Sequence, residues 1–401
     1  MRTLKHGTTR LILCTCCILL LSGCWNSREL DQLGITVAIG VDLNEQGEYE
    51  LSVQLINPSE IATDAPTTRP PVSVYASTGQ TLLEAFRKLT SSSPRKIYLS
   101  QVRMLIFGER LAEEGIIEAL DLFYRDHEMR TEFMMVVAKG VSPRDLLGIL
   151  TPFEKVPANK ILHTIESSEQ NWAPTKGVKI DEVLSDLLSE AKDPVMTGIE
   201  VFGPVDFGKQ RENVELVDSP TKIYVDFLGV FKGDQLIGWL NQNQSKGHNY
   251  IAGSVKSTVI TFPMKGDCLV SVEVLRTNTS TASKLENGKP VITIDLNMEG
   301  NIGEVHCPID LSDPKTIEKI NHLTEEDIKE KMISSIQAAQ NKFESDIFGF
   351  GGILHREHPK YWKKVKDDWN THFAELDYEI NVTSNIRRKG KMVQPTAKGE
   401  S

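Results

Sequence analysis

The residues with the most definite chemistry lie near the N-terminus, in the run Leu21-Ser22-Gly23-Cys24. This run matches the lipobox of bacterial lipoproteins, in which the cysteine thiol takes up a diacylglyceryl group as a thioether and becomes the new N-terminus. Two acyl chains anchor a protein stably, whereas a single chain binds only marginally. We therefore predict that Cys24 is lipidated, with acylation of its amino group left open. The alternative is a chance cysteine behind an ordinary export signal.

Residues 1–23 predict an export signal that is cleaved. The basic residues Arg2, Lys5 and Arg10 precede an uncharged and mostly apolar run from residue 11 to residue 21, which is the usual form of such a signal. The run has about a dozen residues, whereas a membrane-spanning helix needs about 20. A permanent transmembrane helix is therefore the weaker interpretation.

The other cysteines leave two alternatives open. Three of the six cysteines lie in the signal peptide, so Cys268 and Cys307 are the ones that remain besides Cys24. Outside the cytoplasm this pair can form a disulfide, but two buried free thiols that pack as small hydrophobic groups fit the sequence at least as well. His306 adds a third soft ligand beside Cys307, but three groups without regular spacing are a weak indication of a metal site.

The remaining sequence lacks the patterns typical of an enzyme. We find no G-x-x-x-x-G-K-[ST] phosphate loop, no G-x-S-x-G nucleophile elbow and no G-x-G-x-x-G run that opens a helix. The run HREH at residues 355–358 is one residue short of an H-x-x-E-H zinc motif and has no third ligand, so we predict a solvated turn there. We expect a protein that is not an enzyme and has no catalytic residues, metal or cofactor.

The run RDHEMR at residues 125–130 is a dense charge cluster. It is either a recognition patch or a network of ion pairs and caps at the corner between a helix and a strand. Exposed ion pairs each contribute about 0–1 kcal/mol. We favour the network.

The charge balance excludes some partners. The 401 residues carry 45 basic and 55 acidic side chains, a net charge of −10, and removal of residues 1–23 takes away three basic residues and no acids. Nucleic-acid binding needs clustered Lys and Arg, so we expect none. An anionic lipid surface repels such a body, so we expect the lipid anchor rather than charge to hold it at the membrane.

The first half of the mature chain predicts strands that alternate with helices. Residues 34–55 alternate in polarity about a polar turn, which indicates a β-hairpin. The expected order is a hairpin at 34–55, a loop at 57–71, a helix at 81–89, a strand at 102–107, a helix at 108–124, a strand at 133–138 and helices at 163–169 and 181–191. We expect one α+β region over 24–192, divided into two subdomains near residue 150.

The second half predicts a sheet followed by a long helix. Residues 193–220 hold Gly and Pro breakers and are expected to be a linker, and Thr324 is expected to cap a helix that extends to Phe343. Strands are expected at 223–231, 236–240, 254–262, 269–277, 291–299 and 378–386, with a hairpin turn at 232–234. A C-terminal α+β domain at 221–390 and a polar tail at 391–401 complete the prediction. The expected class is α+β, with two to three compact domains in series and helices packed on mixed or antiparallel sheets.

Several segments together resemble one known family. They are GCWNSREL at 23–30, IGVD at 39–42, GQT at 79–81 with EA at 84–85, DLFYRDHEMR at 121–130, FGFG at 348–351, DWN at 368–370 and RRKG at 387–390. The mature chain resembles the Ger(x)C family, the lipoprotein C subunits of germinant receptors in endospore-forming bacteria. Asn26 stands where that family commonly has Asp, which is a small departure.

The resemblance implies a role in a membrane complex. Such subunits consist of compact α+β units in series and work with an integral-membrane A-type subunit and a transporter-like B-type subunit. The complex lies in the spore inner membrane and responds to small nutrients, with which the C subunit makes at most indirect contact. No catalytic residues transfer from the family, and only Cys24 does, as the lipid site. A rival hypothesis is a free-standing solute-binding lipoprotein that captures the nutrient itself.

Overall fold

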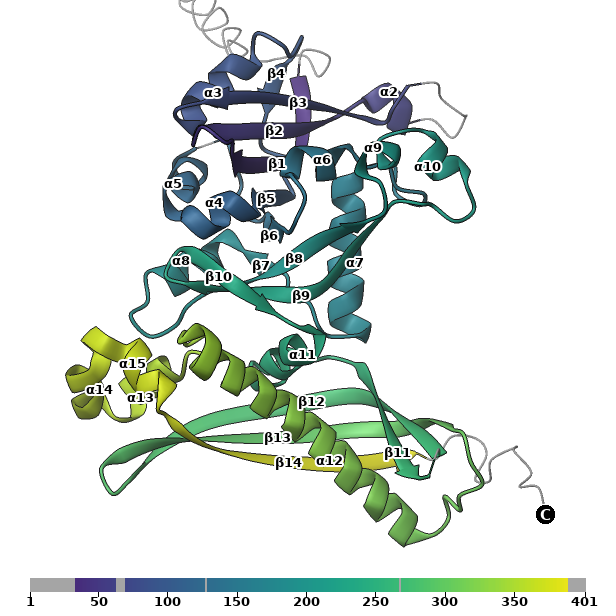
Figure 1. Ribbon diagram of the computed structural model, residues 1–401, viewed down its shortest axis with the longest axis vertical. Coiled ribbons are helices and arrows are strands. Elements are labelled where there is room, and N and C mark those ends of the chain that lie inside the picture. The colour runs from purple at the N-terminus through teal and green to yellow at the C-terminus, as the bar shows by residue number, and fades with distance from the viewer. Residues whose placement is uncertain (1–32, 63–68, 127, 267, 389–401) are drawn as a thin grey trace, which may run out of the picture.

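The computed structural model describes residues 33–62, 69–126, 128–266 and 268–388. Cys24, the predicted signal peptide at 1–23 and the predicted tail at 391–401 lie outside the described residues. The described chain forms two sheets, one toward each end of the long axis (Figure 1). Helices pack on both sheets, so the predicted α+β class is confirmed.

The first sheet has ten strands in a mixed arrangement. Strands β1, β5, β6 and β8 run parallel in its centre, flanked on both sides by antiparallel strands. The path β10-β9-β8-β6-β5-β1-β2-β3 consists of β10 (Gln235–Leu240), β9 (Lys222–Lys232), β8 (Val195–Phe202), β6 (Met134–Ala138), β5 (Met104–Gly108), β1 (Leu33–Leu43), β2 (Tyr49–Ile56) and β3 (Val72–Gly79), with β4 (Lys96–Tyr98) on β1 and β7 (Val178–Lys179) on β6. Every residue of β5 and β6 is buried, as expected for parallel strands that helices cover on both faces.

Helices cover both faces of this sheet. On one face pack α3 (Leu82–Leu89), α4 (Glu109–Glu114), α5 (Ile117–Arg125) and α8 (Ile180–Leu187), and on the other α6 (Pro143–Gly148) and α7 (Pro157–Asn171). Each helix buries one apolar stripe, such as Leu82, Ala85 and Leu89 of α3. Short helices α2 (Pro58–Ile61), α9 (Val205–Gly208) and α10 (Glu212–Glu215) lie in connections.

The second sheet has four strands in the order β11-β12-β13-β14. They are β11 (Thr258–Lys265), β12 (Cys268–Glu286), β13 (Lys289–Val305) and β14 (Asp377–Arg388), and β14 runs parallel to β13. The helices of this half are α11 (Gln242–Ile251), α12 (Pro314–Gln337), its π-helical continuation η3 (Ala338–Phe343), α13 (Phe350–Glu357), α14 (Pro359–Val365), the 3-10 turn η4 (Lys366–Asp368) and α15 (Trp369–Ala374). Within the described ranges, no helix has the length and apolar character that crossing a membrane requires.

The predicted hairpins are confirmed. Strands β1 and β2 pair antiparallel from Leu43↔Tyr49 onward. Strands β9 and β10 pair from Lys232↔Gln235, so their turn lies at Gly233, whose φ of +59° suits a glycine.

The predicted linker at 193–220 is wrong. Strand β8 occupies part of it and lies between β6 and β9, where Met196 and Ile199 are fully buried. Strands β9 and β10, which the prediction placed in the C-terminal domain at 221–390, complete the first sheet, so the second half of the structure begins with α11. No division falls near residue 150 either, since α6 and α7 on both sides of it cover the same sheet. The Gly and Pro residues that suggested a linker occur inside packed strands and turns.

Two predicted helix limits are also wrong. The long helix begins eleven residues earlier than expected, with Asp313 rather than Thr324 as its N-cap and Pro314 in its first turn. Thr324 is buried within the helix and donates to the Ile320 carbonyl oxygen at 2.8 Å. The helix expected at 108–124 is divided into α4 and α5 by Gly115, whose φ is +133°.

Candidate functional site

The two remaining cysteines are joined in the structure. Cys268 begins β12 and Cys307 follows β13, with their Cα atoms 5.3 Å apart and a disulfide between them, a separation that disulfides normally span. Of the two alternatives that the sequence left open, the structure contains the bridge, at a Cα separation that permits it. Formation of this bridge in the exported protein stays a prediction.

Residues 355–358 form the end of α13 rather than a solvated turn. The His355 ring stacks on Trp362, with centroids 5.8 Å apart, whereas His358 Nε2 lies 3.3 Å from the Ser283 carbonyl oxygen. The Glu357 carboxylate accepts hydrogen bonds from the Ser283 amide and hydroxyl, both at 2.7 Å. These residues hold α13 against the β12–β13 hairpin. In the part of the chain that the structure describes, no three His, Cys, Asp or Glu side chains are grouped as metal ligands.

The charge cluster at 125–130 forms the predicted network. Arg125 Nε lies 2.7 Å from Asp121 within α5. Beyond the helix, Glu128 pairs with Lys96 of β4 at 2.6 Å, and Asp126 accepts from the Glu128 amide at 2.7 Å. The cluster thus connects the end of α5 to β4.

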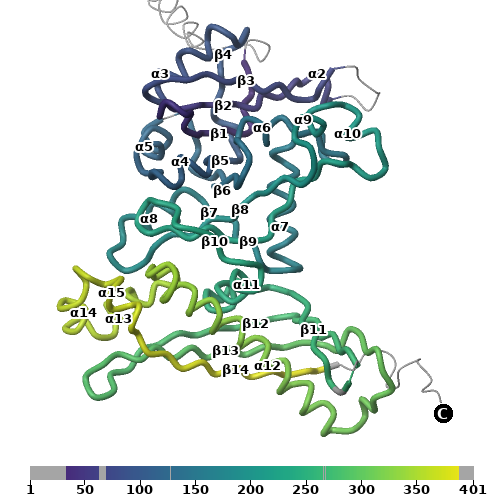
Figure 2. Tube along the Cα trace, viewed as in Figure 1, coloured from purple at the N-terminus to yellow at the C-terminus, as the bar shows by residue number. Residues whose placement is uncertain are grey.

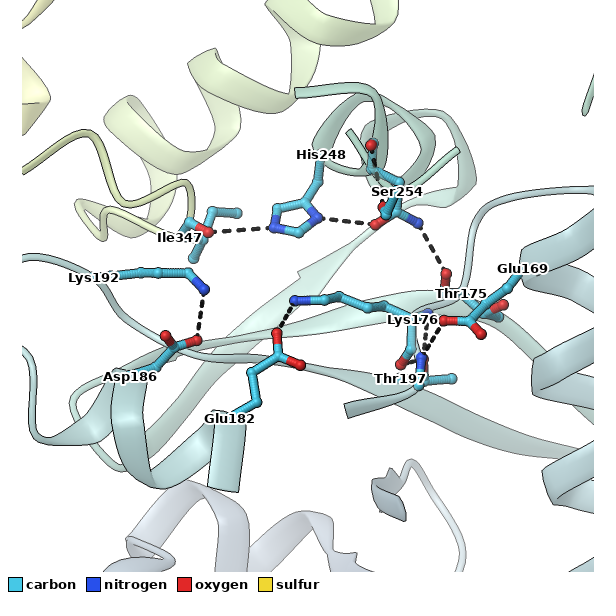
Figure 3. Close-up of polar contacts among 12 residues, drawn as sticks. Glu169, Thr175, Lys176, Glu182, Asp186, Lys192, Thr197, His248, Ser254 and Ile347 are labelled. Atoms are coloured by element: carbon cyan, nitrogen blue, oxygen red, sulfur yellow. Dashed lines mark hydrogen bonds and ion pairs between the residues drawn. The ribbon is translucent and has the colours of Figure 1, made fainter. Parts of the chain in front are cut away.

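A buried polar junction connects the two halves, and no motif in the sequence indicated it. Two ion pairs, Lys176–Glu182 and Lys192–Asp186, lie beside His248 of α11 (Figure 3). The Asp186 and Lys176 side chains are only 12% and 15% exposed. Because α11 is the first element after the first sheet (Figure 2), this junction lies where the chain enters its second half.

His248 is the centre of this junction and is 1% exposed. Its Nδ1 lies 3.1 Å from Asn249 Oδ1 and its Nε2 3.3 Å from the Ile347 carbonyl oxygen. A neutral imidazole carries one N–H, so only one of these contacts is a hydrogen bond at a time. Burial, together with the nearby Lys176 and Lys192, lowers the pKa of His248 to about 3, so the ring is neutral at pH 7 and is not poised as an acid–base catalyst.

A second buried group organises the loop that contacts His248. The Asp346 carboxylate accepts from the amides of Phe348, Gly349 and Gly351 at 2.8–3.1 Å and from the Trp369 indole at 3.0 Å. Burial raises the pKa of Asp346 to about 6, and these hydrogen bonds oppose the rise. The FGFG segment at 348–351 is therefore a carboxylate-binding turn, and its glycines were the signal in the sequence that could have located it.

A groove of about 600 Å³ lies on the first sheet. It is at the carboxyl ends of the parallel strands β6 and β8, the edge at which open α/β sheets commonly bind ligands. Lys139 Nζ lies 2.6 Å from Glu200, 4.6 Å from the Phe227 ring centroid and 5.6 Å from that of Trp239. Among the described residues this groove best combines aromatic surface with charge.

Glycines and a bulge shape the floor of this groove. The register between β8 and β9 shifts after Gly198, and a Cβ atom on Gly198 would lie 2.1 Å from the Phe227 ring. On Gly229 it would lie 2.9 Å from Trp239. Both rings can thus lie against the sheet only because these positions have no side chain.

Comparisons with known proteins identify the family. The model of the Spore germination protein N-terminal domain matches residues 26–201, and that of the Spore germination B3/GerAC-like C-terminal domain matches residues 228–390. Spore germination protein KC of Bacillus subtilis (strain 168) is 33% identical over 386 residues, which cover 94% of this chain and 95% of that protein. The chain belongs to this GerAC-like family. The resemblance to Ger(x)C proteins is therefore confirmed.

Other GerAC-like proteins match along the same length. Spore germination protein B3 of the same organism is 22% identical over 92% of this chain and 94% of its own. The solved structure titled Crystal Structure of the GerBC protein has a TM-score of 0.56 and 16% identity, and the match covers 87% of this chain and 96% of that one. This likeness shows that the fold is shared. The family models separate the halves at residues 201–228, whereas the first sheet continues to Leu240.

Proposed function

We propose that this protein is the lipid-anchored, non-enzymatic C subunit of a nutrient receptor for spore germination. The observation that carries the proposal is the family match over both halves of the chain, to proteins named for spore germination. The partners would be integral-membrane A-type and B-type subunits. Contact of this subunit with the nutrient would be indirect.

The attachment follows from the sequence of the lipobox. Cys24 would carry a diacylglyceryl thioether and hold the body on the outer face of the cell membrane, which becomes the spore inner membrane. Two acyl chains suffice for stable attachment, because each buried CH₂ contributes about 0.8 kcal/mol. Replacing Cys24 with alanine should therefore release the body from the membrane.

Deletion and point variants in the source organism test the proposal. Deletion should abolish the germination response to one nutrient while sporulation stays normal, and C24A should give the same loss with the protein absent from membrane fractions. The double variant C268A/C307A is the matched control, because it removes the other two cysteines of the mature chain, which the structure joins as a disulfide, without touching the anchor. Mass spectrometry that finds the Cys24 thiol unmodified, or unchanged germination with every nutrient after deletion, would contradict the proposal.

The partners need a separate experiment. Cross-linking of receptor complexes purified from spore membranes should connect this chain to both integral-membrane subunits. Recovery of the chain without either subunit would contradict the assignment as a receptor component.

The groove beside Lys139 favours one second candidate, a free-standing solute-binding lipoprotein. Its volume lies within the range of small-molecule sites, about 300–1,000 Å³. Calorimetric titration of the unlipidated C24S chain with candidate nutrients separates the two functions. Micromolar binding that E200Q weakens would support the second candidate, and no binding at millimolar nutrient would exclude it.

A further inference from the structure

The number of residues between Cys24 and the first strand limits which surface of the protein can lie next to the anchor. Strand β1 begins at Leu33, nine residues after Cys24, and nine extended residues span at most about 30 Å. Strand β4 pairs with the start of β1, at Leu33↔Lys96. Both α3 and β4 lie at the opposite end of the long axis from β11–β14 (Figure 1).

One sequence segment at this end of the molecule is basic. Residues 85–108 contain five basic residues and no acidic residue, in a chain with 45 basic and 55 acidic residues. Arg87 and Lys88 lie in the last turn of α3, and Arg95 and Lys96 lie at the start of β4. All four are exposed, and we name them the tether-end patch.

The two arginines of the tether-end patch are available to bind a ligand. Lys88 pairs with Glu84 at 2.8 Å and Lys96 with Glu128 at 2.6 Å, whereas neither Arg87 nor Arg95 has an ion pair within the described residues. A guanidinium group matches the oxygen atoms of a phosphate with two parallel N–H donors. Free arginines beside a lipid anchor therefore suit phosphate headgroups.

Exposed apolar side chains lie next to the basic residues of the tether-end patch. Leu83 is 55% exposed and precedes Arg87 by one turn of α3. Both line a groove of about 380 Å³ together with Phe86 and Leu99. Lys96, Asp126 and Glu128 also line this groove, so its charge is mixed and the exposed Arg87 and Leu83 are the part suited to a membrane interface.

We infer that the tether-end patch rests on the anionic headgroups of the bilayer that carries the anchor, which holds the four-stranded sheet away from the membrane. The inference depends on the proposed lipidation of Cys24. It revises the expectation that charge plays no part in holding the body. The Debye length in cells is about 8 Å, so the acidic residues at the far end are screened and the nearest surface decides the interaction.

Hydrogen–deuterium exchange of the lipidated chain in vesicles tests this inference. The vesicles would contain 30% phosphatidylglycerol in phosphatidylcholine, or phosphatidylcholine alone. Backbone amides at residues 87–96 should exchange several-fold more slowly on the anionic vesicles, and 0.5 M salt should remove the difference. The variant R87Q/R95Q should also remove it, because each basic residue near an anionic surface changes partitioning about fivefold.

The matched control is K363Q/K364Q in α14, which removes the same charge from exposed residues of the second half. It should leave the protection at 87–96 intact. Equal exchange on both kinds of vesicle, or protection that survives R87Q/R95Q, would overturn the inference. A chain that does not float with vesicles at all would instead contradict the lipidation of Cys24, so the two failures are distinguishable.

Discussion

At the scale of single residues, the buried polar groups of the junction are matched to partners inside the protein. His248 and Asp346 are both completely enclosed, yet burial moves their pKa values in opposite directions because it disfavours the charged form of each. Asn249 completes the junction by donating to the carbonyl oxygens of Ala173 and Thr175 at 2.8 and 3.0 Å. These groups therefore hold loops together and are not aimed into a cavity.

The pKa of His248 predicts how stability changes with pH. An unfolded histidine has a pKa of about 6.5, and the folded value is about 3. As the pH falls from about 6.5 toward 3, the unfolded chain takes up a proton that the folded chain refuses, so the free energy of unfolding falls by up to about 1.4 kcal/mol per pH unit. Denaturant unfolding between pH 7 and 4 should show a shallower decline for H248Q. The exposed His322 provides the control H322Q, and equal slopes for wild type and H248Q would contradict the assignment.

At the scale of elements, the start of α12 depends on one cap. Asp313 accepts a hydrogen bond from the Lys315 amide at 3.0 Å, which satisfies one of the free amides of the first turn. D313A should lower the free energy of unfolding by about 1 kcal/mol, whereas D313N keeps an acceptor and should be close to wild type. Urea denaturation measures both. Equal losses for D313N and D313A would show that charge, and not capping, matters there.

The contact between α11 and α12 depends on Gly247. A Cβ atom there would lie 2.1 Å from the Lys331 carbonyl oxygen, and a backbone oxygen cannot rotate away as a side chain can. G247A should therefore destabilise the protein by about 1–3 kcal/mol, the usual cost of overpacking. In α13, G352A would meet only the end of Arg356 at 3.8 Å and should be neutral or stabilising by up to about 1 kcal/mol. Equal denaturation midpoints for the two variants would contradict the close approach.

The sequence predicts those elements whose hydrophobic residues recur periodically. The β1–β2 hairpin was predictable because its hydrophobic residues alternate along the sequence on both sides of a polar turn, although its burial in the folded chain is nearly continuous. The start of α12 was missed although Ile317, Ile320 and Leu323 have helical spacing, because Thr324 and the acidic residues after it resemble an N-terminus, whereas the Asp313-Pro314 pair marks the true beginning. Strand β8 was missed because Gly198 suggests a linker, whereas it makes room for the Phe227 ring of the neighbouring strand. A contact between two strands cannot be seen in the local sequence of either one.

At the scale of the whole molecule, the site was less predictable than the fold. Lipidation at Cys24 depends on a contiguous motif, so it can be proposed from sequence alone. The junction joins residues as far apart as Asp193 and Ser345, and the groove joins Lys139 to Trp239, so each needs the folded chain. The two halves share one apolar core, which includes Leu228 of β9 and Tyr250 of α11.

This shared junction predicts that the two halves unfold together. The Ser345 hydroxyl lies 2.9 Å from Asp193 and 2.7 Å from the Phe231 carbonyl oxygen, and Asp193 also accepts from the Gly233 amide at 2.8 Å. The wild type should therefore show one calorimetric transition.

D193A/S345A should lose about 1–3 kcal/mol of unfolding free energy for each buried partner left unsatisfied. It should also unfold in two steps, because the loop from the second half no longer holds β9. S77A removes a hydroxyl bonded to the Ala85 carbonyl oxygen at 2.6 Å inside the first half, so it should lower stability without splitting the transition. Two transitions in the wild type would contradict the coupling of the halves, and a single unsplit transition in D193A/S345A would mean that the apolar core alone couples them.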